Sequence, residues 1–162
     1  MGREKSSVTP AIRFLKDMKV SFEERPYKYI ERGGTSAFAK QYFVDEHMVI
    51  KTLIMEDEVG NPLIILMHGD MEVSTKALAR TIGAKRIEPS SPEKANRHTG
   101  YMVGGISPFG TRKPMPVYVE STILDLPEIF INGGRRGLLV ALNPREVLRV
   151  LSATPVSVAS RG

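Results

Sequence analysis

The spacing of hydrophobic and polar positions predicts helices and strands that are mixed along the chain. Helices are expected where apolar residues recur every three or four positions behind a capping residue or a proline. Strands are expected where β-branched and aromatic residues alternate with polar ones or form short apolar runs. The predicted helices cover 9–20, 35–43, 74–84, 91–100 and 143–151, and the predicted extended segments cover 21–29, 115–121, 128–133 and 137–142, with a hairpin over 48–70.

Capping residues support several of these helix boundaries. Thr9 and Ser74 are candidates to cap the helices over 9–20 and 74–84. The second and the last helix carry the same kind of signal. Thr35 and Ser36 follow a pair of glycines and are both candidates to cap the second helix. Asn143 and Pro144 open the last helix, and Glu146 stands where a capping-box carboxylate belongs. We therefore expect side-chain caps at both helix starts.

The order of these elements favours a single α+β domain. Strands and helices do not alternate strictly, which argues against a doubly wound parallel sheet and for a mixed or largely antiparallel one. The 162 residues suit one domain with a real core. We expect this domain to cover 1–162, with a flexible N-terminal segment at 1–8.

The composition excludes several kinds of chemistry. The chain contains no cysteine, so disulfides, cysteine-ligated zinc and a cysteine nucleophile are excluded, and a reducing cytoplasm is the expected location. The 41% of hydrophobic residues argues against a disordered chain. The longest apolar runs, such as 62–67, are too short to span a bilayer, and no signal peptide is expected at the N-terminus. We expect no membrane partner.

The net charge of +5 comes entirely from the second part of the chain. Residues 1–60 carry ten basic and ten acidic side chains, whereas residues 61–162 carry thirteen basic and eight acidic ones. Such an excess suits a polyanion such as nucleic acid, and an ordinary solvated surface is the plain alternative. The candidates for phosphate contacts are Lys85, Arg86, Arg112 and Lys113.

The three histidines form no recognisable catalytic or metal-binding pattern. The spacing of His47, His68 and His98 matches neither a zinc site nor a metalloprotease motif. His68 follows a predicted strand and is interpreted as a turn residue. His98 borders a glycine-rich loop, where a substrate contact and a structural role are both open. We expect no metal and no cofactor.

Three features could carry chemistry without a strong nucleophile. The stretch VGGISPFG contains Gly104-Gly105, NGGRRG contains Gly133-Gly134, and Lys51 lies in the middle of an apolar strand. Each has a plain explanation, because glycine pairs tolerate the positive φ of turns and strand lysines usually face solvent. Backbone amides that point into a cleft can instead hold an anion or an oxyanion, and an ammonium adds charge there.

Four motifs in the chain resemble those of the YbaK/EbsC family of aminoacyl-tRNA deacylases. In order they are VIKTLIM, TGYMVGGISPFG, PVYVES and INGGRRG, and the similarity extends from about Thr9 to Leu151. This family is related to the editing (INS) domain inserted in bacterial prolyl-tRNA synthetases. The resemblance implies an α+β fold with a mixed, barrel-like β-sheet surrounded by helices.

The resemblance also implies roles for individual residues. Lys51 matches a strand lysine that contacts the substrate and is needed for activity. The residues implied to receive the terminal adenosine and the ester are Gly104, Gly105, Ile106, Ser107 and Pro108, and those implied to border the aminoacyl pocket are Asn132, the catalytic glycines Gly133 and Gly134, and the aromatic Tyr27. Leu138-Leu139 stands where some relatives carry an aspartate, so any role of that acid is absent here.

The implied function is trans-editing, in which a misattached cysteine or another small residue is removed from tRNA, with tRNA(Pro) as the expected carrier. Mischarged tRNA is the implied partner, and prolyl-tRNA synthetase is a further one. Hydrolysis by water and cyclisation through the cysteine thiol are both open routes. A non-catalytic nucleic-acid-binding module or regulator is the alternative, followed by an accessory subunit that needs a synthetase.

The implied binding of a substrate to the first glycine loop can be tested by mutation. A ribose and an ester that approach Gly104 and Gly105 closely would leave no room for a Cβ. If a ligand, and not a turn, requires these glycines, at least one of Gly104→Ala and Gly105→Ala should keep the melting temperature while losing activity.

Overall fold

The computed structural model describes residues 8–161. Most of the predicted flexible segment at 1–8 lies outside these residues, and Val8 is exposed. The helices are α1 (Pro10–Asp17), α2 (Gly34–Tyr42), α3 (Thr75–Ile82), α4 (Pro92–Thr99) and α5 (Arg145–Leu151), with 3-10 helices η2 (Glu46–Met48) and η3 (Ser121–Asp125). The strands are β1 (Phe22–Pro26), β2 (Val49–Asp57), β3 (Pro62–His68), β4 (Glu72–Val73), β5 (Ile87–Pro89), β6 (Val117–Glu120), β7 (Ile129–Arg135), β8 (Leu138–Leu142), β9 (Thr154–Val156) and β10 (Ala159–Ser160).

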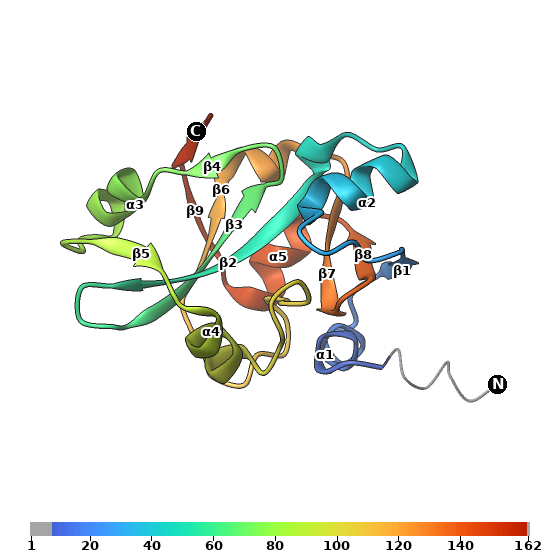
Figure 1. Ribbon diagram of the computed structural model, residues 1–162, viewed down its shortest axis with the longest axis horizontal. Coiled ribbons are helices and arrows are strands. Elements are labelled where there is room, and N and C mark those ends of the chain that lie inside the picture. Colours follow the sequence, from blue (N-terminus) through green and yellow to red (C-terminus); the bar gives the residue numbers. More distant parts are fainter. Residues whose placement is uncertain (1–7, 162) are drawn as a thin grey trace.

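Eight of the strands form one mixed sheet with helices packed around it (Figure 1). The order is β1-β8-β7-β2-β3-β6-β9, and β5 adds to β2. The β2–β3 and β7–β8 pairs are antiparallel, whereas β2–β7, β3–β6 and β6–β9 are parallel. This confirms the predicted α+β class and mixed sheet. Within residues 8–161 no pairing joins β1 to β9, so the path of strands stays open.

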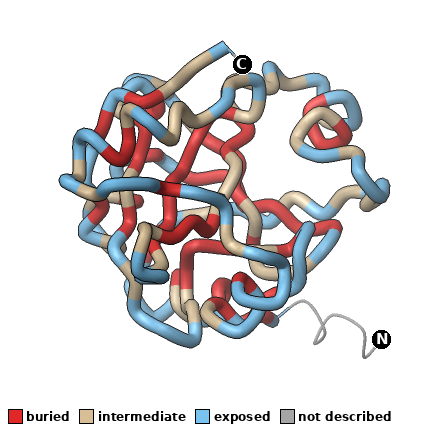
Figure 2. Tube along the Cα trace, turned by 60° about the vertical axis from the view of Figure 1, so that its left-hand side comes forward, coloured by how far each residue is buried: buried red, intermediate tan, exposed pale blue. Residues whose placement is uncertain are grey.

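The long apolar run in β3 is buried on both faces of the sheet. Ile64 and Leu66 face the larger core cluster, and Ile65 and Met67 face a second cluster that includes Leu78 of α3. Because successive side chains of a strand point to opposite faces, a strand covered on both sides needs apolar residues at every position. Figure 2 shows the buried segments running through the middle of the molecule. None of the described helices is long and apolar enough to cross a membrane.

The predicted caps of the second helix are wrong. The N-cap of α2 is Gly33, which makes no side-chain cap hydrogen bond. The Thr35 hydroxyl donates instead to Glu46 at 2.6 Å, and the Ser36 hydroxyl donates to the Gly33 carbonyl at 3.0 Å. Because α2 begins at Gly34, Thr35 and Ser36 lie inside its first turn and not at the cap position.

The predicted capping box of the last helix is half correct. The N-cap of α5 is Pro144, one residue later than predicted, but the Asn143 side chain still accepts a hydrogen bond from the Arg145 N–H at 2.9 Å. The Glu146 carboxylate does not return to the helix start, because it pairs with Arg149 one turn further on. A cation three residues away therefore replaces the backbone N–H as its partner.

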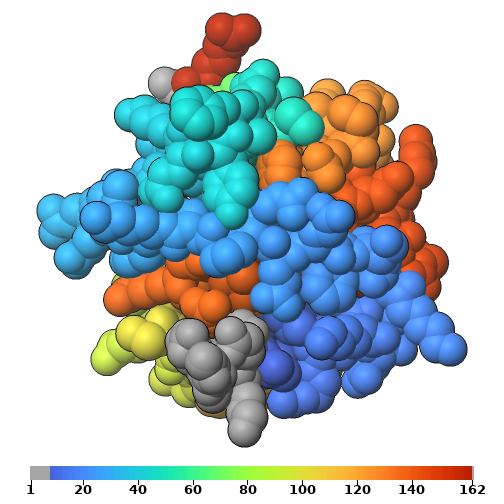
Figure 3. Space-filling view, turned by 90° about the vertical axis from the view of Figure 1, so that its right-hand side faces the viewer, coloured from blue at the N-terminus to red at the C-terminus, as the bar shows by residue number. Residues whose placement is uncertain are grey.

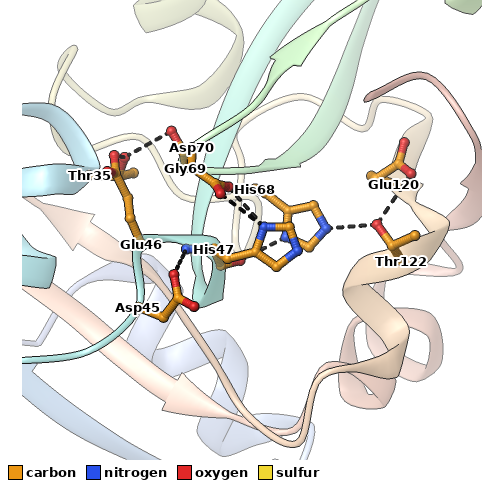
Figure 4. Close-up of polar contacts among 9 residues, drawn as sticks. All are labelled: Thr35, Asp45, Glu46, His47, His68, Gly69, Asp70, Glu120 and Thr122. Atoms are coloured by element: carbon orange, nitrogen blue, oxygen red, sulfur yellow. Dashed lines mark hydrogen bonds and ion pairs between the residues drawn. The ribbon is translucent and has the colours of Figure 1, made fainter. Parts of the chain in front are cut away.

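His68 is a buried residue at the end of β3 and not a turn residue (Figure 4). Its Nδ1 donates to the His47 carbonyl at 2.7 Å, and its Nε2 lies 2.7 Å from the Thr122 hydroxyl. The ring stacks on the His47 ring, with 3.6 Å between the centroids. The His47 carbonyl can only accept, so Nδ1 carries a proton, and the Thr122 hydroxyl beside Nε2 also lies 3.3 Å from the Glu120 carboxylate, so both ring nitrogens have hydrogen-bond partners.

Burial is the main cause that lowers the pKa of His68 below 6.5, and the neighbouring His47 lowers it further. The Asp70 and Glu120 carboxylates and the hydrogen bond to the His47 carbonyl act in the opposite direction. The folded protein therefore resists protonation at a pH where the unfolded chain accepts it. The stability that His68 contributes is present above its unfolded pKa and is lost as the pH falls below it.

We expect the free energy of unfolding to fall between pH 7.5 and pH 5.5, and to fall less steeply in His68→Gln. Urea unfolding at both pH values measures this difference. The pKa of His98 is also lowered by burial and by nearby Lys113 and Arg97, so His98→Gln serves as the comparison. An unchanged pH dependence in His68→Gln would mean that His68 does not contribute.

Candidate active site

A cavity of about 890 Å³ lies along an open edge of β2. On this side β2 pairs with β7 only through Val49 and Ile50, and with β5 only from Met55 to Asp57. Among the described residues no strand covers the edge over 51–54, and the cavity occupies this gap. Its other walls come from two sides. One side is formed by the segment between β1 and α2, the start of α2, the loop after α4 and the β7–β8 turn, and the other by β4, the start of α3 and the segment from β5 into α4.

Half of the ten residues predicted for the substrate site line this cavity. Those in the wall are Tyr27, Lys51, Gly104, Ile106 and Asn132. Those that do not line it are Gly105, Ser107, Pro108, Gly133 and Gly134. Ser107 is fully buried and its hydroxyl accepts from the Phe109 N–H at 3.1 Å, so it supports the loop from behind.

Lys51 presents an unpaired ammonium to the cavity. The side chain is half-buried, and within residues 8–161 its ammonium makes no hydrogen bond or ion pair. A lysine on an ordinary solvated face would extend into bulk water. This one stands in the wall of a cavity, where a bound ester or phosphate oxygen would meet it.

Thr52, which sequence reasoning missed, brings a second unpaired polar group to the same wall. Its hydroxyl oxygen is buried and has no hydrogen-bond partner among the described residues. Lys51 and Thr52 point to opposite faces of β2, yet both line the cavity because it wraps around the open edge of the strand. A buried hydroxyl without a partner is costly, which is the arrangement expected where a ligand supplies the partner.

The backbone amides predicted to hold an oxyanion divide into two groups. The Gly105 N–H donates to the Met102 carbonyl at 2.8 Å, and the Gly134 N–H donates to the Asn132 side chain at 2.7 Å. Both amides are therefore already committed. The N–H groups of Gly104 and Ile106 have no acceptor within residues 8–161, and both residues line the cavity. They are the amides of this loop that can serve a substrate.

Two side chains hold the glycine loops together. Asn132 donates to the Gly104 carbonyl at 3.2 Å, and Arg136 donates from Nε to the Val103 carbonyl at 2.9 Å. The Arg136 guanidinium also lies 5.1 Å from the centre of the Tyr29 ring. Figure 3 shows the segment between β1 and α2 crossing this face beside the β7–β8 turn. Asn132 and Arg136 therefore fix the position of the free amides.

Sequence reasoning missed Arg136 and Tyr29 as residues of this wall. Arg136 had been counted only as one of the basic side chains of the second part of the chain. Nothing in the local pattern shows that its guanidinium reaches the loop after α4, because that contact depends on the tertiary fold.

Tyr27 forms an aromatic wall of the cavity. Its backbone N–H donates to Gly137 at 2.9 Å, and its ring meets Phe38 edge to face, with 5.3 Å between the centroids. Burial is the main cause that raises the pKa of Tyr27 above 10.0, followed by the nearby Tyr29. The phenol therefore stays neutral at physiological pH, which suits packing against an apolar group.

The four predicted phosphate contacts lie in two separate places. Lys85 and Arg86 line a second cavity beside α3. The backbone N–H groups of Arg112 and Lys113 donate hydrogen bonds to the end of α4, to the carbonyls of Thr99 at 3.1 Å and His98 at 2.9 Å.

His98 does not line the main cavity, which supports its structural role.

His47, His68 and Asp70 form a cluster that the sequence spacing did not reveal. Their potential metal-ligand atoms lie within 4.8 Å of one another. Both nitrogens of His68 are already hydrogen-bonded, and His47 Nδ1 lies 2.9 Å from Asp70. The two rings are stacked within 6° of parallel, so their lone pairs do not converge on one point. The donor set fits a hydrogen-bonded chain better than a metal centre.

The fold is shared with a crystal structure of a candidate trans-editing enzyme for prolyl tRNA synthetase. The TM-score is 0.81 at 21% sequence identity, over 94% of this chain and 99% of the other. In sequence, the chain is 27% identical over 141 residues to EbsC of Enterococcus faecalis, named as a candidate Cys-tRNA(Pro)/Cys-tRNA(Cys) deacylase, and the match covers 86% of each protein. A proline–tRNA ligase of Brachyspira hyodysenteriae is 26% identical over 86 residues, which is 53% of this chain and 15% of the ligase.

The sequence profile of the aminoacyl-tRNA editing domain matches residues 33–150. This range contains most of the residues that line the cavity, including those of β2 with Lys51, the loop after α4 and the β7–β8 turn. The match confirms the predicted family and the predicted class of function, editing of aminoacyl-tRNA. The chain belongs to the aminoacyl-tRNA editing domain family.

Proposed function

We propose that this protein removes cysteine, or another small amino acid, from mischarged tRNA(Pro) by cleaving the aminoacyl ester. One observation carries the proposal: the unpaired ammonium of Lys51 and the free amides of Gly104 and Ile106 line one cavity. The names of the related EbsC and of the ligases support cysteine and tRNA(Pro). A cavity of about 890 Å³ is large enough for a terminal adenosine with a small aminoacyl group.

In this proposal the chemistry is electrostatic. Attack on the ester carbonyl carbon gives a tetrahedral intermediate whose oxygen is negative, and the Gly104 and Ile106 N–H groups donate to that oxygen. Lys51 adds a positive charge nearby. When the intermediate collapses, the carbon–oxygen bond to the ribose breaks, and the ribose oxygen takes up a proton in place of the one that the attacking water or thiol gives up. An ester is reactive enough that no protein nucleophile is required.

Two attacking groups are compatible with this site. A water molecule would release the free amino acid, whereas the thiol of a bound cysteine would attack its own carbonyl and release a thiolactone. The cavity supplies the same stabilisation of the oxyanion in both cases. Chromatography of the released product separates them, since only cysteine can cyclise through sulfur and a serine-charged tRNA would give free serine alone.

A panel of charged tRNAs tests the proposal directly. Purified protein is incubated with cysteinyl-, alanyl- and prolyl-tRNA(Pro) and with cysteinyl-tRNA(Cys), and loss of the ester is followed over time. We expect cysteinyl-tRNA(Pro) to be cleaved fastest and prolyl-tRNA(Pro) to survive. Tight binding without cleavage, with and without added prolyl-tRNA synthetase, would favour a binding module instead.

Thr52→Val should leave the fold intact while reducing deacylation by about tenfold, because it removes a buried hydroxyl that has no protein partner but faces the substrate site. Thr52→Ser keeps the hydroxyl and should keep most of the activity. Initial rates and melting temperatures of both variants measure these effects. Equal rates in the wild type and Thr52→Val would show that the hydroxyl makes no contact with the substrate.

A further inference from the structure

A second cavity, of about 490 Å³, lies between α3 and β5 and carries four cationic side chains. Lys76 and Arg80 come from α3, and Lys85 and Arg86 come from the segment that leads into β5. The rest of its lining is small or apolar: Thr75, Ala79, Ala84 and Ile87. We call it the α3–β5 groove.

Most of the cations in this groove have no counter-charge. Within residues 8–161 the side chains of Lys76, Arg80 and Lys85 form no ion pair, and only Arg86 has a carboxylate nearby, Glu88 at 3.8 Å. Lys76 and Arg80 lie one turn apart on a helix, TKALARTI, that contains no acidic residue. Like charges at this spacing repel each other, so the arrangement favours a bound anion.

The Glu58 carboxylate bonds the backbone of the groove and not its side chains. The Glu58 carboxylate accepts the Lys85 N–H at 2.9 Å and the Arg86 N–H at 3.4 Å. A hydrogen bond from its own N–H is the main cause that lowers the pKa of Glu58, and the bonds from Lys85 and Arg86 lower it further. The latter two also fix the turn before β5. The turn is therefore held in place while its two cationic side chains stay directed into the groove.

The α3–β5 groove is continuous with the active-site cavity. Thr75, at the start of α3, lines both. Strand β5 joins them a second time, since Ile87 lines the groove and Pro89 lines the cavity. Figure 1 shows α3 and β5 together at one end of the molecule, beside the far end of β2. A chain that leaves the cavity past Thr75 therefore passes directly over the cations.

We propose that the α3–β5 groove binds the phosphates of the tRNA acceptor end while the aminoacyl adenosine occupies the cavity. This inference rests on the proposed function. It adds Lys76 and Arg80 to the predicted phosphate contacts and separates Lys85 and Arg86 from Arg112 and Lys113, which line neither cavity. An unpaired cationic groove that opens into the reaction site suits a polyanion joined to the reacting ester.

The test removes three cations and compares them with three others. The groove variant carries Lys76→Gln, Arg80→Gln and Lys85→Gln, and the control carries Arg13→Gln, Lys16→Gln and Lys40→Gln, which are exposed and line neither cavity. Both lose the same charge. Binding of uncharged tRNA(Pro) is measured over a range of salt concentrations, and deacylation is measured on cysteinyl-tRNA(Pro) and on the cysteinyl-adenosine ester, which has no phosphate chain.

The groove variant should bind tRNA at least about tenfold more weakly, with the slope of log K against log salt reduced by about two. Its rate on the tRNA relative to the adenosine ester should fall by a similar factor. Equal losses in the control, or loss only in Arg112→Gln/Lys113→Gln, would overturn the assignment, as would equal affinity for duplex DNA. If the wild type cleaves neither ester, the proposed function fails, whereas selective loss of tRNA binding in the groove variant still supports the groove.

Discussion

Lys51→Met should reduce deacylation at least about tenfold while the protein remains folded, because the substitution removes a charge aimed at the developing oxyanion. Methionine keeps the length of the apolar stem, so the packing of β2 is preserved. The ammonium has no partner among the described residues, so its loss leaves no other group unsatisfied. The melting temperature should change little, as is usual where no stabilising interaction is lost.

The comparison variant is Lys40→Met on α2, which removes an equal charge from an exposed position outside both cavities. Single-turnover rates, measured with the enzyme in saturating excess over cysteinyl-tRNA(Pro), separate chemistry from binding. Lys51→Arg keeps the charge but changes its geometry, and it should recover only part of the rate. Wild-type rates in Lys51→Met would remove this side chain from the reaction.

The helices and the longer strands could be predicted from the sequence because their signals are local. The run PLIILM and the caps at Thr9 and Ser74 predict structure within a few residues of themselves. Both hydroxyls accept the expected N–H three residues on, at 3.1 Å in each case. The short strands β4, β5, β9 and β10 have two or three residues each, and they exist only because distant segments pair with them.

The candidate site could be predicted only in part, because only some of its features have a local signal in the sequence. The motifs located Lys51 and the two glycine loops, but they could not say which backbone amides are free. Which amides are free depends on two tertiary contacts. The Asn132 side chain accepts a hydrogen bond from the Gly134 N–H, and the Met102 carbonyl accepts one from the Gly105 N–H. Thr52 carries no signal at all, since an unpaired hydroxyl is visible only once every neighbour is in place.

The two glycines of the first loop should respond differently to alanine, because the surrounding backbone leaves no room for a Cβ at Gly105. A Cβ on Gly105 would lie 2.7 Å from the Arg136 backbone nitrogen and 2.8 Å from Arg135 backbone atoms. Backbone cannot move aside cheaply, so Gly105→Ala should cost about 1–3 kcal/mol and lower the melting temperature by roughly 5 °C. Activity should fall as well, because the shift displaces Arg136, which holds the loop.

Gly104→Ala isolates the effect of the ligand, because Gly60 provides a matched control. Both glycines have a positive φ, +92° at Gly104 and +88° at Gly60, so both alanine variants carry similar backbone strain. A Cβ on Gly60 meets nothing within 4 Å, and a Cβ on Gly104 meets mainly the Tyr29 hydroxyl at 2.6 Å, at the movable end of a side chain. The two variants should therefore melt within a few degrees of each other, whereas only Gly104→Ala should lose most deacylation. Equal activity in the two variants would show that no substrate approaches this loop.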